Sequence, residues 1–176
     1  MPPDITRAPI IVTATMGAAD FAWADGLRRA HFPPERNQLP AHITLFHHLP
    51  PSIEAELLQR LASLCASPPP AARLAGFIDL GGGVALRIES PALMAMRDEL
   101  ADAFAGLLTP QDRARPRLHV TIQNKVPMER ARALCAALEK GFRPRPFAIA
   151  GLALWRYMGG PMGGSWLPIR AMTFRG

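Results

Sequence analysis

Two short segments of the chain carry the same pattern, a histidine followed two positions later by a threonine. The first covers residues 42–50 (HITLFHHLP) and the second covers residues 119–127 (HVTIQNKVP). In both segments a β-branched residue separates histidine from threonine, an aliphatic residue follows, and a proline stands eight positions after the histidine. A unit repeated in this way indicates an internally duplicated architecture.

The types and spacing of these residues point to phosphodiester chemistry. In a strand, residues i and i+2 share a face, so His42 should lie beside Thr44 and His119 beside Thr121. Two such strands facing one groove present two imidazoles and two hydroxyls. One imidazole can take a proton from an attacking oxygen while the other delivers a proton to the leaving oxygen. Hydroxyls and positive groups can hold the phosphate, and in-line attack by this route needs no metal.

Other side chains close to the motifs could contact a substrate. His48 and Lys125 each stand six positions after a motif histidine, and with Phe46 they share the motif face if the strands stay regular. Lys125 could neutralise phosphate, although a solvated lysine at a strand end explains it equally well. We expect His47 to face away from the groove, and His31 to be structural at a helix end.

Aromatic and basic residues outside the motifs suggest nucleic acid as a ligand. Trp155 and Tyr157 share a face of a predicted strand and could stack on a nucleobase, although core packing is the more common role of such residues. Arg113, Arg115 and Arg117 precede the second motif and could attract a polyanion, or could be part of a solvated loop.

Hydrophobic spacing predicts that strands and helices alternate around both motifs. We expect the first helix to begin with Asp20 as its N-cap and to bury Trp23, Leu27 and Ala30. Residues 81–83 (GGG) should form a turn. Strands are expected over 10–15, 42–48, 77–80, 84–88, 118–123, 147–157 and 166–174, with helices after Asp20, Pro50, Ser90 and Pro127, and loops over 111–117 and 159–165.

Composition excludes several classes of protein. The 176 residues are 49% hydrophobic and 19% charged, which argues against disorder. Cys65 and Cys135 have no CxxC partner, so neither a zinc ribbon nor a disulfide scaffold is expected. No signal peptide and no membrane span is expected, and the chain should be cytoplasmic. The net charge of +6 favours anionic ligands.

With its paired motifs, its element order and its length, the chain resembles the two-histidine (2H) phosphoesterase superfamily. The similarity is greatest to the RNA 2′,3′-cyclic phosphodiesterases, also described as 2′-5′ RNA ligases, and includes segments 32–50 and 153–161. The resemblance implies a bilobal α+β fold of two pseudo-symmetric lobes, each with an antiparallel sheet and helices, flanking a groove. It also implies that His42 and His119 are the acid/base pair, in either order, and that Thr44 and Thr121 bind phosphate. The second motif continues as QNK rather than with the arginine common in characterised RNA enzymes.

These observations predict a single domain over residues 1–176 with internal duplication. We expect a phosphodiesterase, without metal or other cofactor, that opens 2′,3′-cyclic phosphate ends of RNA or nucleotides, with reversible 2′-5′ ligation as a related activity. Neither a membrane nor an obligate protein partner is expected. One alternative is a catalytically weak nucleotide- or RNA-binding module. Another is a metal-dependent phosphoesterase using His42, His47, His48 and His119, which the lack of acidic residues in the motifs disfavours.

Overall fold

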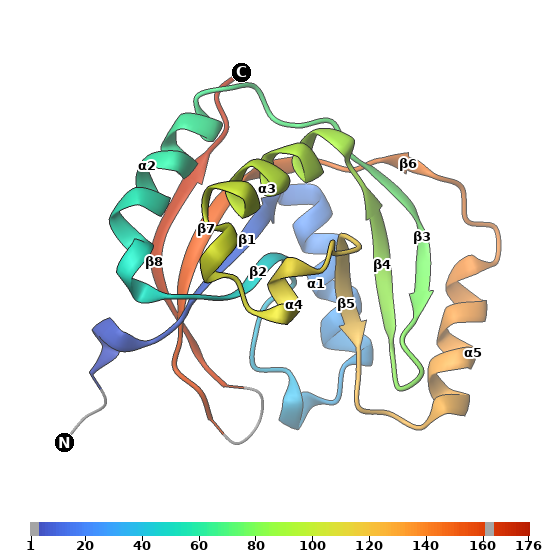
Figure 1. The fold of residues 1–176 in the computed structure, drawn as a ribbon. Helices are drawn as coiled ribbons and strands as arrows, with labels where there is room; N and C mark the ends of the chain where they lie inside the picture. Colours follow the sequence, from blue (N-terminus) through green and yellow to red (C-terminus); the bar gives the residue numbers. More distant parts are fainter. Residues whose placement is uncertain (1–3, 161–163) are drawn as a thin grey trace.

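The computed structural model describes residues 4–160 and 164–176, which form two four-stranded antiparallel sheets with helices around them (Figure 1). The first sheet has the order β2-β1-β7-β8 and the second has the order β5-β4-β3-β6. The expected α+β fold is therefore confirmed. The strands of the first sheet, in sheet order, are Ile43–Leu49, Ile10–Met16, Ile149–Tyr157 and Trp166–Thr173. Those of the second sheet are His119–Gln123, Val84–Glu89, Arg73–Asp79 and Arg145–Pro146.

The two motif strands occupy the same place in their sheets. Both β2 and β5 are edge strands, and each pairs with the strand that precedes it in the chain, β1 or β4. A helix connects each such pair, α1 (Ala18–His31) or α3 (Pro91–Ala103). A second helix follows each motif strand, α2 (Glu54–Cys65) or α5 (Met128–Glu139). Origin by duplication, within one domain, stays a prediction.

The helices also connect the two sheets to each other. Helix α2 packs against β7 and β8, and α5 packs against β3 and β4. Helix α1 follows a strand of the first sheet but contacts β5, the motif strand of the second (Figure 1). The short helix α4 (Pro110–Arg113), which precedes β5, contacts β2. Each motif strand is thus supported by a helix that belongs to the other half of the arrangement.

The first helix differs from its prediction. Its N-cap is Gly17, whereas Asp20 bonds the Arg145 guanidinium at 2.7 Å and accepts a hydrogen bond from the backbone of Ala148. Trp23 is 37% exposed, with the Arg145 guanidinium 4.9 Å from its ring centroid. The residues that α1 buries are Ala24 and Arg28. Hydrophobic spacing could not find this face because one of its two buried residues is an arginine.

The arginine-rich segment was predicted to be a loop, and this prediction was partly wrong. Residues 110–113 form α4, with the Thr109 side chain as N-cap accepting from the backbone N–H of Asp112 at 3.3 Å. The short strand β6 was not predicted, and the expected loop 159–165 includes residues 161–163, which lie outside the described residues. In the described ranges, no helix has both the length and the apolar content needed to cross a membrane.

Replacing the N-cap of α3 should measurably destabilise the fold. The Ser90 hydroxyl accepts from the backbone N–H of Leu93 at 3.2 Å and donates to the Ala71 carbonyl at 2.7 Å, and the residue is buried. We expect Ser90→Ala to lower the free energy of unfolding by about 1–2 kcal/mol, measured by urea denaturation. Ser63→Ala, at an exposed position of α2, should change it by less than about 0.5 kcal/mol. Equal effects of the two variants would contradict this role of Ser90.

Candidate active site

Both motif histidines are held by the same hydrogen bond. The Nδ1 atom of His42 lies 2.8 Å from the Pro40 carbonyl, and Nδ1 of His119 lies 2.7 Å from the Arg117 carbonyl. In each case the carbonyl belongs to the residue two positions earlier. A carbonyl only accepts, so Nδ1 must carry the proton in both rings. The neutral form of each ring therefore has an unprotonated Nε2, which is available to accept a proton.

Both motif strands contain a β-bulge directly after the threonine. In β2, Thr44 pairs with Thr13 but Phe46 pairs with Val12, which leaves Leu45 as the extra residue. The register of β5 shifts in the same way, since its pairing with β4 skips Ile122, the residue after Thr121. A bulge reverses the alternation of side chains beyond it. The faces predicted from a regular strand therefore hold only up to the threonines.

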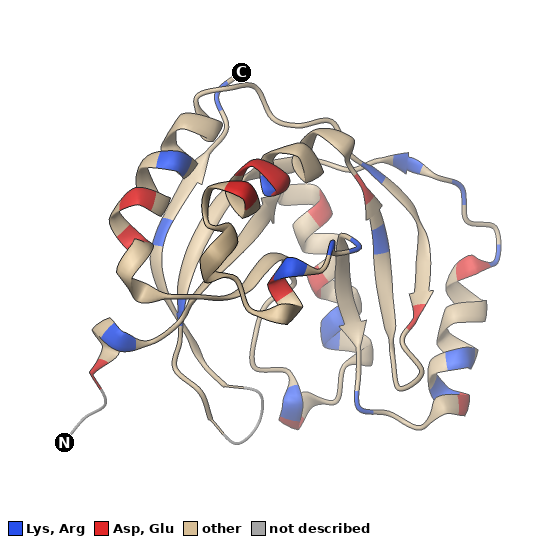
Figure 2. Cartoon of the chain, in the orientation of Figure 1, with Lys and Arg blue, Asp and Glu red and all other residues tan. Residues whose placement is uncertain are grey.

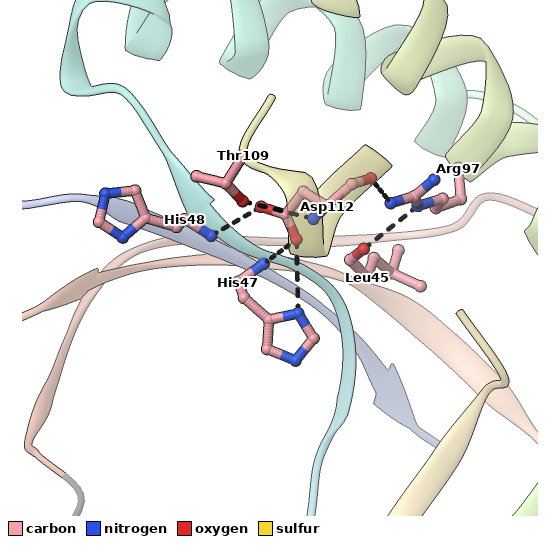
Figure 3. A network of polar contacts seen from close by, with 6 residues as sticks. All are labelled: Leu45, His47, His48, Arg97, Thr109 and Asp112. Atoms are coloured by element: carbon pink, nitrogen blue, oxygen red, sulfur yellow. Dashed lines mark hydrogen bonds and ion pairs between the residues drawn. The ribbon is translucent and has the colours of Figure 1, made fainter. Parts of the chain in front are cut away.

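Two register shifts in β2, the bulge at Leu45 and a second shift between Phe46 and Leu49, correct three assignments made from the sequence. Phe46 is only 1% exposed and packs in the core, with the Arg97 guanidinium 4.4 Å from its ring centroid. His48 is exposed and points away from His47 (Figure 3). His47, which was expected to face away from the groove, instead lines a hollow together with His119. The sequence carries no signal for this exchange because Leu45 is as good a residue for a regular strand as for a bulge.

The bulge in β5 moves Lys125 away from the face of His119. Gln123 takes the place that Phe46 has in the first motif and is buried, with no hydrogen-bond partner for its Oε1 among the described residues. Strand β5 ends there, and Lys125 is exposed with a φ of 61° in the turn that follows. Its backbone N–H donates to the Asn124 side chain at 2.9 Å. The structure therefore does not place Lys125 with the motif residues.

Two buried arginines hold the motif strands from the opposite sides of the site. Arg97 of α3 donates from Nε to the carbonyl of Leu45, the bulge residue of β2, at 3.3 Å. Arg28 of α1 donates from Nη1 to the Thr121 carbonyl, beside the bulge of β5, at 2.9 Å and from Nε to Asn37 at 2.8 Å. The rigid, charged guanidinium of each arginine thus donates a hydrogen bond to the motif strand of the other half of the fold.

A buried carboxylate completes the support of β2 and orients His47 (Figure 3). Asp112 of α4 accepts hydrogen bonds from the backbone N–H groups of His47 and His48, both at 2.8 Å, and its Oδ1 lies 3.4 Å from the Nδ1 of His47. Its backbone carbonyl accepts from Arg97. Although burial raises the pKa of Asp112, its contacts with His47 and the backbone outweigh this and keep that pKa below its usual range. Asp112 is therefore a buried anion that lies beside the His47 imidazole.

The hollow beside His119 has a volume of about 370 Å³. Besides His119, its wall includes four basic side chains and one acidic side chain, which are His47, Arg97, Arg115, Arg117 and Asp112. The hydroxyl groups of Thr44 and Thr121, both half-buried, bond no other described residue. Their hydroxyls are available to a ligand.

The hollow beside His42 is aromatic and has a volume of about 280 Å³. The Trp166 ring centroid lies 4.8 Å from that of His42 and 6.1 Å from that of Trp155, and both tryptophans line the hollow. The Trp155 indole N–H donates to the buried Thr13 hydroxyl at 3.0 Å, which fixes its ring. Tyr157 lies farther along β7, opposite Trp166, and is not part of the wall. Trp166 was not predicted as a site residue because it lies in another strand.

The surroundings of His42 favour its neutral form. Burial is the main cause that lowers the pKa of His42 from 6.5 to about 4, and it outweighs the opposing hydrogen bond to Pro40. The positive charges of Arg28, His119 and His47 lower it further, which places these groups within electrostatic range of His42. Strands β2 and β5 also contact each other. The structure thus brings the two motif strands into contact, with His119 near enough to affect the pKa of His42. Within residues 4–160 and 164–176, no three His, Cys, Asp or Glu side chains are grouped to hold a metal ion.

Comparisons with known proteins agree with this arrangement. A family model described as the 2′-5′ RNA ligase superfamily matches residues 17–161. Among solved structures, TT0787 of Thermus thermophilus has a TM-score of 0.63 at 18% identity, covering 96% of this chain and 98% of that chain. Structures of E. coli LigT complexed with NADP⁺ and with 3′-AMP have TM-scores of 0.59 and 0.54, with the same identity and coverage. No curated protein matches the chain. At such identities, the solved structures demonstrate a shared fold.

The low pKa of His42 should make the fold sensitive to acid. The unfolded chain protonates this histidine at its ordinary pKa of 6.5, whereas the folded chain does so only near 4. The contribution of His42 to the free energy of unfolding is therefore complete above pH 6.5 and is lost as the pH falls toward 4. The loss in free energy of unfolding should be at most about 3 kcal/mol, because solvent at the groove screens part of it.

Urea unfolding across this pH range tests the effect in variants that lack one imidazole. His42→Gln should lose less stability on acidification than the wild-type chain. His48→Gln, which removes an exposed imidazole from the same strand, should follow the wild type. If His42→Gln and the wild type showed the same pH dependence, the neutral state assigned to His42 would be wrong.

Proposed function

The chain belongs to the 2′-5′ RNA ligase superfamily, and we propose from this that it opens 2′,3′-cyclic phosphate ends of RNA without a metal ion. Membership makes it an enzyme that acts on phosphodiester bonds. The observation that supports the specific reaction best is the matched hydrogen bond of the two motif histidines to the carbonyls of Pro40 and Arg117. Two imidazoles with the same orientation and tautomer suit a reaction that needs one proton acceptor and one proton donor.

We assign the base to His42 and the acid to His119. The pKa of about 4 leaves His42 neutral at pH 7, so its Nε2 can take a proton from water as the water oxygen bonds phosphorus. The bond from phosphorus to the 3′ oxygen breaks, and a protonated His119 delivers its Nε2 proton to that oxygen. The product is a 2′-phosphate with a free 3′-hydroxyl, and exchange with solvent restores both rings. In ligation, the 5′-hydroxyl of a second strand takes the place of water: its oxygen bonds phosphorus while His42 accepts its proton, the bond to the 3′ oxygen breaks and His119 protonates that oxygen, which leaves a 2′-5′ linkage.

The phosphoryl oxygens need donors as negative charge develops on them. Thr44 and Thr121 supply hydroxyls from the two motif strands, and we add His47, whose imidazole is held by Asp112, as a further donor. This arrangement places an imidazole on the first motif, where the second motif has Asn124. Electrostatic stabilisation by fixed donors is usually the largest contribution to such a reaction.

The aromatic hollow beside His42 is the proposed site for the terminal nucleobase. Trp166 lies against His42, and Trp155 is fixed by its hydrogen bond to Thr13, so both rings can take part in stacking without reorganising. The structures of LigT complexed with 3′-AMP and NADP⁺ are consistent with nucleotide binding in this fold. Tyr157 and Phe46 are not part of this proposed site.

Removal of either motif imidazole tests the mechanism. We expect His42→Ala and His119→Ala each to lower kcat for a 2′,3′-cyclic nucleotide by about 10²–10⁴-fold, since general acid and base catalysis contribute that much. His48→Ala should retain wild-type activity. The dependence of kcat/KM on pH should be bell-shaped, with the acidic limb near pH 4 set by His42.

The same assay, run with EDTA, distinguishes the alternatives. Full activity in either motif variant would refute the two-histidine mechanism. Activity lost in EDTA and restored by a metal ion would favour a metal-dependent phosphoesterase. Binding of cyclic nucleotide without turnover by the wild type would favour a nucleotide-binding module.

A charge substitution tests the role of His47. We expect His47→Ala to raise KM about tenfold, because a hydrogen bond to a charged group such as phosphate contributes about 1.5–3 kcal/mol. His47→Lys should restore much of the affinity, whereas His47→Gln should not. If the alanine, lysine and glutamine variants had the same KM as the wild type, His47 would have no part in binding phosphate.

A further inference from the structure

The face of the second sheet that carries His119 continues into a row of arginines. Arg87 of β4 is paired directly with His119, and Ala85 is paired with Thr121. Side chains of directly paired residues project from the same face, with Cβ atoms about 5 Å apart. Arg87 therefore begins next to the motif histidine on the motif face.

The next strand adds a second arginine to this face. Glu89 stands two residues after Arg87 and is paired with Arg73 of β3, so all three share the face of His119. Glu89 accepts from Arg87 at 2.7 Å and from Arg73 at 3.0 Å. Arg87 also donates to the Ala75 carbonyl at 3.1 Å, which lays its guanidinium across β3. Gly76 permits this position, because a Cβ there would lie 3.2 Å from Nη2 of Arg87.

These arginines line a hollow of about 740 Å³, which we call the strand hollow. Its wall is both basic and apolar, and Glu89 is its one acidic residue among the described parts of the chain. Figure 2 shows basic residues on β3, on β4 and in the segment before β5. The basic residues of the wall are Arg73, Arg87, Arg115 and Arg117, and its apolar residues include Ile88, Pro91, Met94, Pro116 and Leu118.

The strand hollow is continuous with the active site through one short segment. Residues 115–117 line both this hollow and the one beside His119. The Arg117 carbonyl holds His119, and two residues span at most about 7 Å. Arg115 is paired with Asp98 at 3.3 Å, whereas Arg117 makes no ion pair within the described residues. A polyanionic ligand that extends from the reacting phosphate can therefore cross residues 115–117 and contact the arginines of the strand hollow.

We propose that the strand hollow binds the body of the single-stranded RNA whose cyclic phosphate end reacts at His42 and His119. This inference rests on the proposed function. Four arginines against one glutamate suit a polyanion, and cations interleaved with apolar surface are typical of sites for single-stranded nucleic acid. Arg73 lies two strands away from His119 in the sheet, about 10 Å across the strands, so we expect an oligoribonucleotide but not a mononucleotide to contact it. The site therefore makes the enzyme selective for an oligoribonucleotide over a cyclic mononucleotide.

The kinetic test compares two substrates with the same terminal nucleotide. One is a 2′,3′-cyclic mononucleotide and the other is a short oligoribonucleotide ending in the same cyclic phosphate. We expect Arg73→Ala to raise KM severalfold for the oligoribonucleotide and to leave KM for the mononucleotide unchanged. Glu89→Gln, which removes the hollow's acid, should lower KM for the oligoribonucleotide. Arg60→Ala is the matched control, since the Arg60 side chain is likewise ion-paired and partly exposed, but lies on α2. Arg60→Ala should change KM for neither substrate.

A binding measurement separates failure of this proposal from failure of the proposed function. Fluorescence anisotropy with an oligoribonucleotide ending in a 3′-phosphate needs no turnover. Loss of one phosphate contact in Arg73→Ala should reduce the slope of log affinity against log salt by about 0.7. The proposal is overturned if Arg73→Ala binds like Arg60→Ala, or if Arg73→Ala impairs both substrates equally. If the wild type turned over neither substrate while binding still depended on Arg73, the proposed function would fail and the strand hollow would stand.

Discussion

The site depends on a bulge in each motif strand, held in place by a buried arginine from the opposite half of the molecule. Arg97 bonds the carbonyl of Leu45, and Arg28 bonds the carbonyl of Thr121. A guanidinium taken out of water is costly unless its donors are satisfied, so each arginine fixes the strand segment that satisfies it. These two hydrogen bonds connect α3 to β2 and α1 to β5. They hold the two motif strands in place on either side of the contact between β2 and β5.

This arrangement explains how two histidines of the same motif come to lie in different surroundings. Both rings are fixed by a hydrogen bond to a carbonyl two residues earlier, so their orientations match. Their surroundings differ, because His42 is beside tryptophans and His119 is beside arginines. Burial and the positive charge of Arg28 both keep the pKa of His42 low. A symmetric motif in an asymmetric environment thus suits the proposed assignment of His42 as the proton acceptor and His119 as the donor.

The sequence predicts the parts of the structure that depend on local pattern. Periodicity identifies the long strands and helices, and the repeat identifies the two motifs that the fold brings together. Prediction from the sequence fails where tertiary contacts override the local pattern. Neither bulge has a signature, because Leu45 and Ile122 are ordinary strand residues, so the faces of Phe46 and His47 are exchanged. Trp166 joins the site only through the pairing of β7 with β8, which spacing along one strand cannot reveal.

We infer that His42 and His119 both keep a proton on Nδ1 and present Nε2 to one phosphate. This arrangement can be measured by long-range ¹H–¹⁵N NMR of the imidazoles at neutral pH, recorded with and without inorganic phosphate. We expect the neutral form of both rings to carry its proton on Nδ1, and phosphate to shift the Nε2 signals of both rings. A neutral Nε2–H tautomer in either ring, or a response to phosphate from only one ring, would show that the two histidines do not share a phosphate in this way.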